Sequence, residues 1–145
     1  DVERTDALLV LLFFGLRKSE LKSLRIIDDN RLECETSKER LGQNVFLRKI
    51  PFTPAAKKVI PYIDFEKAKT ANLNTVATRM KRLFSNHHPH ELRHTFITRC
   101  KECGVQSAVV SIWAGHSLSG TITTTVYTHY SDEFQLKEAE KVNYR

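Results

Sequence analysis

The stretch from Ala7 to Phe14 is the feature that most constrains the fold of this 145-residue chain. Every residue in it is apolar, so a helix built from it has no polar face to turn toward water. Thr5 can cap the start of such a helix, and Gly15 is a good helix end. The stretch is too short to span a membrane. The sequence therefore predicts a helix buried at the centre of the fold.

The remaining pattern is mainly helical. Alternation of apolar and polar residues predicts two strands, Arg31 to Glu35 and Val45 to Phe52, joined by a polar loop that contains Gly42. The expected helices cover Ser19 to Leu24, Thr53 to about Phe65, Asn74 to Phe84, Pro89 to Gly104, Gln106 to Trp113, Gly120 to Tyr127 and Glu133 to Val142. The predicted fold class is α+β, mainly α with a small antiparallel β-sheet, in a single domain over residues 1–145.

The chain is basic, with 23 Lys and Arg against 17 Asp and Glu and a formal net charge of +6. This charge is compatible with a polyanionic partner, and equally with a lysine-rich surface on a soluble domain. The three cysteines, Cys34, Cys100 and Cys103, are an odd number and favour a reduced compartment over a disulfide framework. We therefore expect a cytoplasmic protein that does not associate with membranes.

The first candidate site residues follow the buried helix. Arg17 comes directly after the glycine that ends this helix, so it can emerge at the edge of the core. Glu20 lies one turn later and can brace Arg17 or a neighbouring histidine. The alternative is that both residues only cap and solvate a helix junction.

The second group lies at the start of the helix that opens at Pro89. His90, Arg93 and His94 have the spacing i, i+3 and i+4, which places them on neighbouring rows of one helix face. We expect this face to be polar and a second face, around Phe96, to pack. An arginine gains nothing from the macrodipole at a helix N-terminus, so its position indicates a bound anion. The alternative is two surface histidines and an arginine paired with a glutamate of the same helix.

The third group follows Gly115, where His116 and Tyr127 lie in one segment. Tyrosine is a weak nucleophile, but cations stabilise its phenolate, which can then attack phosphorus. Lys38, in the predicted hairpin loop, can reach a bound DNA strand and protonate the leaving oxygen. Arg40 is its rival for that role.

Together these residues fit the cleavage of a DNA phosphodiester by tyrosine. Arg17 and Arg93 can clamp the non-bridging oxygens, and His116 can donate a further hydrogen bond. These groups would stabilise the charge of the pentavalent transition state. His90 can accept the proton of Tyr127 as general base. The covalent intermediate keeps the energy of the phosphodiester, so rejoining needs no ATP, and we expect no metal or other cofactor.

Four motifs occur in order along the chain: Gly-x-Arg-x-x-Glu-Leu at residues 15–21, His-x-x-Arg-His at 90–94, Ala-Gly-His-Ser at 114–117 and Thr-Thr-Val-Tyr-Thr-His at 124–129. They resemble the catalytic domain of the tyrosine recombinases, the phage-integrase family, over nearly the whole chain. The family pattern has leucine in place of Ala114 and one more residue before the tyrosine. The resemblance also implies a catalytic lysine in a β-hairpin, which is Lys38 here. Tyr130 is a competing nucleophile, but the flanks of Tyr127 match the family.

The resemblance implies the DNA breaking-rejoining enzyme fold and a site-specific recombinase, an integrase of a phage or mobile element. Its catalytic residues would be Arg17, Lys38, His90, Arg93, His116 and Tyr127, supported by Glu20 and His94. Its partners would be double-stranded DNA, further copies in a tetramer on DNA, and an accessory DNA-bending protein. The expected setting is the nucleoid of a bacterial cell, for a bacterial or phage-encoded protein.

The resemblance also bears on domain organisation. The family has an N-terminal DNA-binding domain, which we expect to be absent from residues 1–145. Its C-terminal segment passes to a neighbouring protomer, and residues 133–145 could form such an exchanged helix. The alternative is a tail that packs within its own chain.

Three other interpretations remain. A zinc site could use His90, His94, Cys100 and Cys103, but all four lie on one predicted helix, whereas zinc needs converging ligands. A DNA-binding regulator without catalysis would use the helices that flank Gly104. A relaxing enzyme of the type IB topoisomerase class would use similar tyrosine chemistry.

Overall fold

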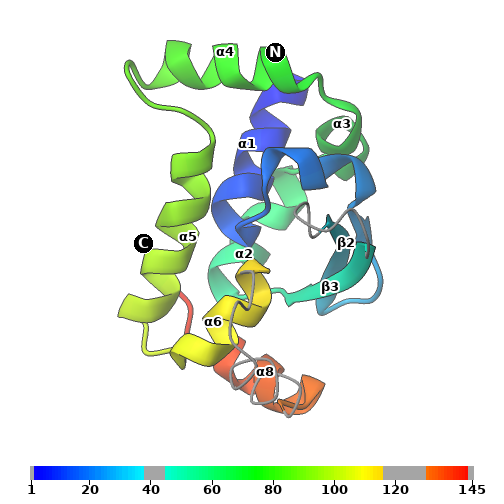
Figure 1. The fold of residues 1–145 in the computed structure, drawn as a ribbon, viewed down its shortest axis with the longest axis vertical. Helices are drawn as coiled ribbons and strands as arrows, with labels where there is room; N and C mark the ends of the chain where they lie inside the picture. Colours follow the sequence, from blue (N-terminus) through cyan, green and yellow to red (C-terminus); the bar gives the residue numbers. More distant parts are fainter. Residues whose placement is uncertain (1, 38–44, 116–129, 144–145) are drawn as a thin grey trace.

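The structure is a computed structural model that describes residues 2–37, 45–115 and 130–143 (Figure 1). Its elements in chain order are α1 (Val2–Phe14), the 3₁₀ helix η1 (Lys18–Ser23), β1 (Arg25–Ile26), β2 (Arg31–Ser37), β3 (Val45–Pro51), α2 (Pro54–Val59), the 3₁₀ helix η3 (Ile60–Tyr62), α3 (Phe65–Thr70), α4 (Leu73–Leu83), α5 (His90–Glu102), α6 (Ser107–Ala114) and α8 (Asp132–Ala139). The predicted fold class is confirmed, because the described chain is mainly helical and has one small antiparallel sheet. No helix among the described residues is long and apolar enough to cross a membrane.

Helix α1 forms the centre of the fold, as predicted. Its residues Ala7, Val10 and Phe14 have no exposed surface, and the helix contacts α2, α3, α4 and α5, which surround it in Figure 1. The predicted start was wrong, since α1 begins at Val2 and Thr5 lies inside it. Residues 3 and 4 are glutamate and arginine, good helix formers that extend the helix past Thr5.

The end of α1 is set by Gly15, as predicted. Its φ of 70° is left-handed, and its amide donates to the Leu11 carbonyl at 3.0 Å. A Cβ atom on Gly15 would lie 2.3 Å from Cδ2 of Phe96 on α5. Glycine is therefore required both by the backbone conformation and by the close approach of α5.

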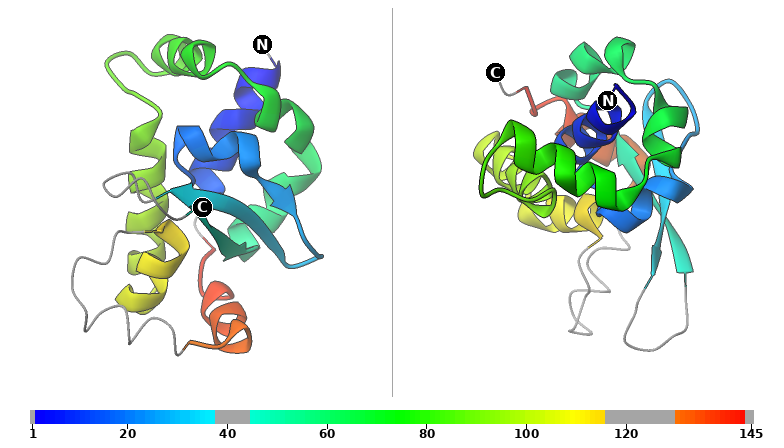
Figure 2. Two further views of the ribbon diagram at one scale, coloured as in Figure 1. Left: turned by 45° about the vertical axis from the view of Figure 1, so that its right-hand side comes forward. Right: turned by 90° about the horizontal axis from the view of Figure 1, so that it is seen from above.

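The sheet has the strand order β1-β2-β3, and both strand pairs are antiparallel (Figure 2). The predicted hairpin of β2 and β3 is confirmed, with Leu32 opposite Ile50 and Cys34 opposite Arg48. These four side chains are all buried, so the inward row of β3 carries a charged residue. The sequence pattern did not predict β1, because two residues are too few to show an alternation of apolar and polar side chains.

The single helix predicted from Thr53 to about Phe65 was wrong. Thr53 does cap α2, accepting a hydrogen bond from the Ala56 amide at 3.0 Å, but α2 ends at Val59. Pro61 lies in the following 3₁₀ turn, and proline has no amide hydrogen to donate to the carbonyl four residues earlier, so the α-helical hydrogen bonds cannot continue through it. Asp64 then caps the separate helix α3.

Helices α4, α5 and α6 lie close to their predicted ranges. Asn72 caps α4, which ends at Leu83, one residue before its predicted limit. Pro89 is the cap residue of α5 rather than its first helical residue. The predicted glycine end of α5 is confirmed by Gly104, which has a φ of 88°. The helix predicted over Gly120 to Tyr127 lies outside the described residues.

Helix α8 begins at a cap residue, Ser131, and ends at Ala139, before the predicted Val142. It lies next to α6 in Figure 1. Gln135 accepts a hydrogen bond from Nε1 of Trp113 at 3.1 Å, and Glu138 accepts one from the Gln106 amide at 3.1 Å. These contacts join α8 to both ends of α6. Exchange of the tail between protomers stays a prediction.

Gly15→Ala should destabilise the protein, because Ala would be strained at this φ and its Cβ would overlap Phe96. We expect a loss of about 2–4 kcal/mol in the free energy of unfolding. Urea titration followed by the fluorescence of Trp113, the single tryptophan, measures it. Gly104→Ala is the matched control, since its φ is also positive but no atom lies within 4 Å of the added Cβ. Equal losses in the two variants would contradict the role of the Phe96 contact.

Candidate functional site

Four charged side chains gather where α1, η1, β3 and α5 meet the C-terminal end of α6. We call them the arginine cluster: Arg17, Glu20, Arg48 and Arg93. Helix α5 packs along α1, and α6 contacts both α5 and β3, an arrangement that can be followed in Figures 1 and 2. Residues far apart in the sequence are thus brought to one place.

Arg17 is held by two acceptors and still reaches solvent. Its backbone amide donates to Oε1 of Glu20 at 2.7 Å, and its Nη1 donates to Oε2 of the same carboxylate at 3.2 Å. Its Nη2 donates to the Gly115 carbonyl at 3.2 Å. The side chain remains 34% exposed. The structure therefore places Glu20 against Arg17, as expected, and leaves part of the guanidinium accessible to a ligand.

Arg93 is buried, which corrects the expectation that it shares a polar face with the histidines. It is 3% exposed, and its Nη1 donates to the Gly15 carbonyl at 2.7 Å. The reason is its spacing: Arg93, Phe96 and Cys100 follow one another at three and four residues, so all three lie on the packing stripe of α5. The alternative pairing with a glutamate of α5 is not observed, since Nη1 binds a carbonyl at the C-terminal end of α1.

Burial first, and then the charges of Arg17 and Arg48, together lower the pKa of Arg93 to about 10. The group still carries its positive charge at neutral pH. The Gly15 carbonyl belongs to the negative end of the α1 dipole, which partly offsets this charge. Within the described chain, Arg93 is thus a buried cation with no carboxylate of its own.

His90 and His94 are exposed on the first turns of α5. Their rings meet edge to face, with centroids 4.6 Å apart. Partial burial lowers the pKa of His90 below its usual 6.5, and the charges of His94, Arg93 and Arg17 lower it as well. His90 is therefore mainly neutral at pH 7, the state in which an imidazole can accept a proton.

Sequence reasoning missed Arg48. Its Nη1 and Nη2 donate to the two oxygens of Glu20 at 2.6 and 2.9 Å, and its Nε donates to the Trp113 carbonyl at 2.7 Å. Its Nη1 also donates to Oγ1 of Thr36 at 2.5 Å. The available signal was an arginine two residues before Ile50, in the inward row of a half-buried strand.

The electrostatics of the cluster favour an anion. Burial raises the pKa of Glu20, but hydrogen bonds and charges from Arg48 and Arg17 outweigh this effect, and the net pKa is lowered. Glu20 is therefore ionised at neutral pH. Within the described part of this cluster, one carboxylate faces three guanidinium groups, and this surplus of positive charge is partly desolvated. A phosphate group suits such a site.

Lys38, its rival Arg40, His116 and Tyr127 lie outside the described residues. The described chain approaches two of them, since β2 ends at Ser37 and α6 is capped by Gly115. Five of the eight predicted site positions lie among the described residues. Arg17 binds Glu20 directly, the charge of Arg17 lowers the pKa of Arg93 and of His90, and the ring of His94 meets that of His90.

Tyr130, the competing nucleophile, is described. Its hydroxyl donates to Oε1 of Gln106 at 3.1 Å, and its ring stacks on Phe134 with centroids 5.3 Å apart. Gln106 caps the start of α6, whereas Gly115, which contacts Arg17, caps its end. Tyr130 therefore lies at the wrong end of α6 to meet the arginine cluster in this arrangement.

The residues of the zinc alternative do not converge. His94 is exposed whereas Cys100 is buried, on different sides of α5. Burial raises the pKa of the Cys100 thiol to about 12, so it stays protonated. Across residues 2–37, 45–115 and 130–143, no group of three or more His, Cys, Asp or Glu side chains could hold a metal ion.

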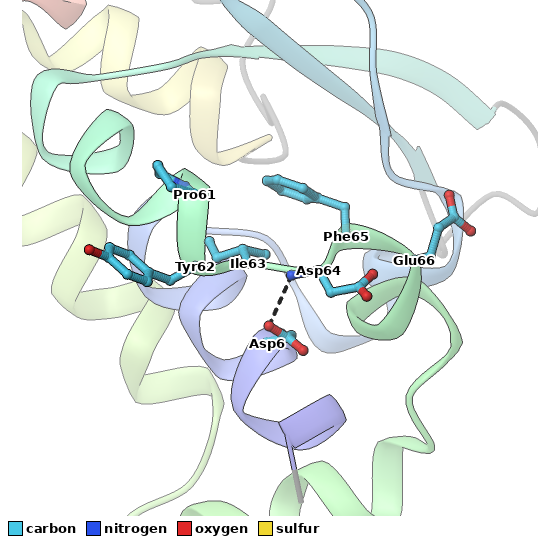
Figure 3. A pocket seen from close by; sticks show the side chains of 7 residues that line it. All are labelled: Asp6, Pro61, Tyr62, Ile63, Asp64, Phe65 and Glu66. Carbon is cyan, nitrogen blue, oxygen red and sulfur yellow. Dashed lines mark hydrogen bonds between the residues drawn. The ribbon is translucent and has the colours of Figure 1, made fainter.

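An open depression lies near the start of α3, lined by Asp6 and by residues from Pro61 to Glu66 (Figure 3). Oδ1 of Asp6 accepts a hydrogen bond from the Asp64 amide at 3.0 Å. The acidic residues Asp6, Asp64 and Glu66 line it, and no predicted site residue within the described chain does. Carboxylates repel phosphate, so this depression is a poor site for a nucleic-acid backbone.

No protein-family model matches the chain. Among curated proteins, a tyrosine recombinase of Thermosipho africanus is 29% identical over an alignment of 161 positions, which covers 98% of this chain and 55% of that protein. A tyrosine recombinase of Pseudothermotoga lettingae is 32% identical over an alignment of 158 positions, which covers 97% of this chain and 54% of that protein. The chain thus spans about half the length of the curated relatives it matches.

Two solved structures share the fold. An integrase from mycobacterium phage Brujita superposes with a TM-score of 0.65 at 21% identity, over 97% of this chain and 52% of that one. The Tn1549 transposon integrase, solved in complex with circular intermediate DNA, gives a TM-score of 0.50 at 23% identity, over 95% and 57% of the two chains. The chain therefore aligns over nearly all of its residues with about half of two curated tyrosine recombinases, and it shares its fold with two integrases.

Proposed function

We propose that this chain is the catalytic domain of a site-specific DNA recombinase, which cuts and rejoins DNA through a 3′-phosphotyrosine intermediate. The observation that carries the proposal is the arginine cluster. Arg17 is braced by an ionised, buried Glu20 and remains partly open to solvent. Arg93 adds a second cation beside it. Membership of the tyrosine recombinase and integrase family is part of this proposal. The similarity to two curated tyrosine recombinases supports the reaction class, and the cluster would hold the phosphate.

In the proposed reaction Arg17 and Arg93 bind the non-bridging oxygens of the scissile phosphate, and His116 donates a further hydrogen bond. The Tyr127 hydroxyl attacks phosphorus in line and passes its proton to His90, whose lowered pKa keeps it neutral. The bond from phosphorus to the 5′ oxygen breaks.

Lys38 gives a proton to that 5′ oxygen, so cleavage leaves a 3′-phosphotyrosine and a free 5′ hydroxyl. Rejoining is the reverse attack by a 5′ hydroxyl of the same or another strand. Bonds broken and formed are of the same kind, so the cycle needs no ATP.

The proposed partner is double-stranded DNA. Its supports are the net charge of +6 and the similar Tn1549 integrase, which was solved with DNA. The proposal has four further parts. The protein assembles as a tetramer on paired DNA sites, and an accessory DNA-bending protein assists it. Residues 133–145 are exchanged between protomers, and an N-terminal DNA-binding domain lies outside residues 1–145. We propose that a phage or mobile element encodes the protein and that the protein acts at the nucleoid.

Tyr127→Phe should abolish covalent attachment to DNA while leaving DNA affinity nearly unchanged, because it removes only the attacking oxygen. The assay is trapping on a nicked duplex that carries the DNA ends flanking the encoding gene, read on a denaturing gel with peptide mapping of the adduct. Tyr130→Phe is the matched control and should form the adduct as wild type does. An adduct that survives in Tyr127→Phe and disappears in Tyr130→Phe would move the nucleophile. DNA binding by wild type without any adduct would favour the non-catalytic regulator.

Arg17→Ala should slow single-turnover cleavage by about 100-fold or more, since a charge-assisted contact to the transition state is lost. Arg17 is partly exposed, so the fold should survive the change. Arg99→Ala removes an exposed arginine of α5 that pairs with Glu102 and is the control, with an expected rate near wild type. A normal rate in Arg17→Ala would remove this residue from the site.

The cleavage rate should fall with acid as His90 gains a proton. Because the pKa of His90 is lowered, the rate should hold as pH falls from about 8 and decline only below about 6.5. His94→Ala removes a neighbour that lowers this pKa, so the midpoint of the decline should move to higher pH. Single-turnover rates across this range measure both effects. A midpoint that does not respond to His94→Ala would argue against His90 as the base.

A further inference from the structure

Arg48 is a buried member of the arginine cluster, with a side chain only 2% exposed. All three of its side-chain nitrogens already donate to acceptors of the protein, so none is left to bind DNA, whereas the hydrogen bond of Arg93 to Gly15 uses Nη1 alone. We propose that Arg48 is a positioning residue, which fixes Arg17 through Glu20 and holds in register the three chain segments that lead to Arg17, Lys38 and His116. This inference rests on the function proposed above, since it concerns the same site.

The first link runs through Glu20. Its Oε1 accepts from the Arg17 amide at 2.7 Å and from Nη2 of Arg48 at 2.9 Å. Its Oε2 accepts from Nη1 of Arg17 at 3.2 Å and from Nη1 of Arg48 at 2.6 Å. Both carboxylate oxygens are therefore shared between the two arginines. The fork of Arg48 fixes the plane of the carboxylate, and that plane fixes the direction of the Arg17 guanidinium.

The second link runs to the end of α6. Nε of Arg48 donates to the Trp113 carbonyl at 2.7 Å. A Cβ atom on Gly115 would lie 2.4 Å from Nη1 of Arg48, so the backbone there packs directly on the guanidinium. Arg17 binds the Gly115 carbonyl as well, at 3.2 Å. The two arginines thus hold the last turn of α6 together, immediately before His116 in the sequence.

The third link runs through the sheet. Arg48 lies opposite Cys34 in the pairing of β3 with β2, and its Nη1 donates to Oγ1 of Thr36 at 2.5 Å. Oγ1 of Thr36 donates in turn to Oε2 of Glu20 at 3.2 Å. Strand β2 ends one residue later, at Ser37, directly before Lys38. One guanidinium therefore joins η1, the end of α6 and the hairpin.

The chemistry of arginine explains why another cation would not serve. Lysine keeps the charge that Glu20 requires, but it offers one nitrogen, which cannot bind both carboxylate oxygens and the Trp113 carbonyl with the geometry of a fork. Arg48→Lys therefore separates charge from placement. Loss of charge, as in Arg48→Met, would leave Glu20 buried without its main partner and would destabilise the fold.

The test compares Arg48→Lys with wild type in three measurements: the thermal midpoint, DNA affinity and the single-turnover rate of adduct formation. We expect a lower thermal midpoint that still leaves the protein folded at the assay temperature, because lysine cannot replace every buried hydrogen bond of Arg48. DNA affinity should stay close to wild type, and the rate should be at least tenfold lower. Arg25→Lys is the matched control, because Arg25 also lies in the sheet and pairs with a buried glutamate, Glu33. Its rate should be unchanged. A wild-type rate in folded Arg48→Lys would overturn the proposal.

A second readout does not depend on activity. The Arg17 amide donates to Glu20, so its hydrogen-exchange protection and NMR shift report the position of the carboxylate. In Arg48→Lys this amide should lose protection while amides of α1 keep theirs, and full protection would overturn the proposal. If Arg48→Lys fails to fold, Arg48→Met combined with Glu20→Leu removes both charges. If this double variant recovers both its stability and its cleavage rate, Arg48 has a role in folding alone. Absence of an adduct with wild type would refute the proposed function, and the Arg17 amide would still test the positioning.

Discussion

The arrangement of the candidate site depends on one buried carboxylate. Glu20 lies between Arg17 and Arg48 and accepts hydrogen bonds from both. Like charges at short range repel strongly where water is excluded, so guanidinium groups this close need an anion between them. Because Arg48 donates to both oxygens of Glu20, it fixes that carboxylate, and Arg17 retains an accessible side that contacts no other carboxylate within the described chain. The ion pair of Glu20 with Arg48 thus orders the site, and Arg17 and Arg93 account for its surplus of positive charge.

The fold delivers these groups through the end of a single helix. Gly15 ends α1, and its carbonyl accepts the hydrogen bond of the buried Arg93. The missing Cβ of the same residue lets Phe96 approach, which brings α5 and Arg93 close enough to make that bond. Arg17 follows two residues later. The separation of the two arginines is therefore set by backbone geometry rather than by flexible side chains, which suits a site that must hold a phosphate in one orientation.

Much of the fold could be predicted from local pattern. The uniformly apolar stretch predicted α1, alternation predicted β2 and β3, and glycines marked the ends of α1 and α5. The sequence signal for the break after α2 is Pro61, which the prediction of a single helix from Thr53 to about Phe65 did not take into account. The site was harder, because its contacts are not local: Arg48 binds Glu20 across 28 residues, and Arg17 binds Gly115 across 98. The spacing i, i+3 and i+4 predicted that Arg93 lies beside His90 and His94, and only the packing of α1 against α5 shows that the Arg93 side chain points inward.

The charge of the cluster bears directly on how such a site would discriminate between ground state and transition state. A phosphodiester carries one negative charge, and a pentavalent transition state distributes more charge over its equatorial oxygens. A surplus of cations already fixed in place stabilises the second more than the first, without reorganisation during the reaction. Burial lowers the pKa of Arg93 to about 10 together with the charges of Arg17 and Arg48, which repel the guanidinium. An arriving phosphate relieves this repulsion, so binding and catalysis would draw on the same arrangement of charge.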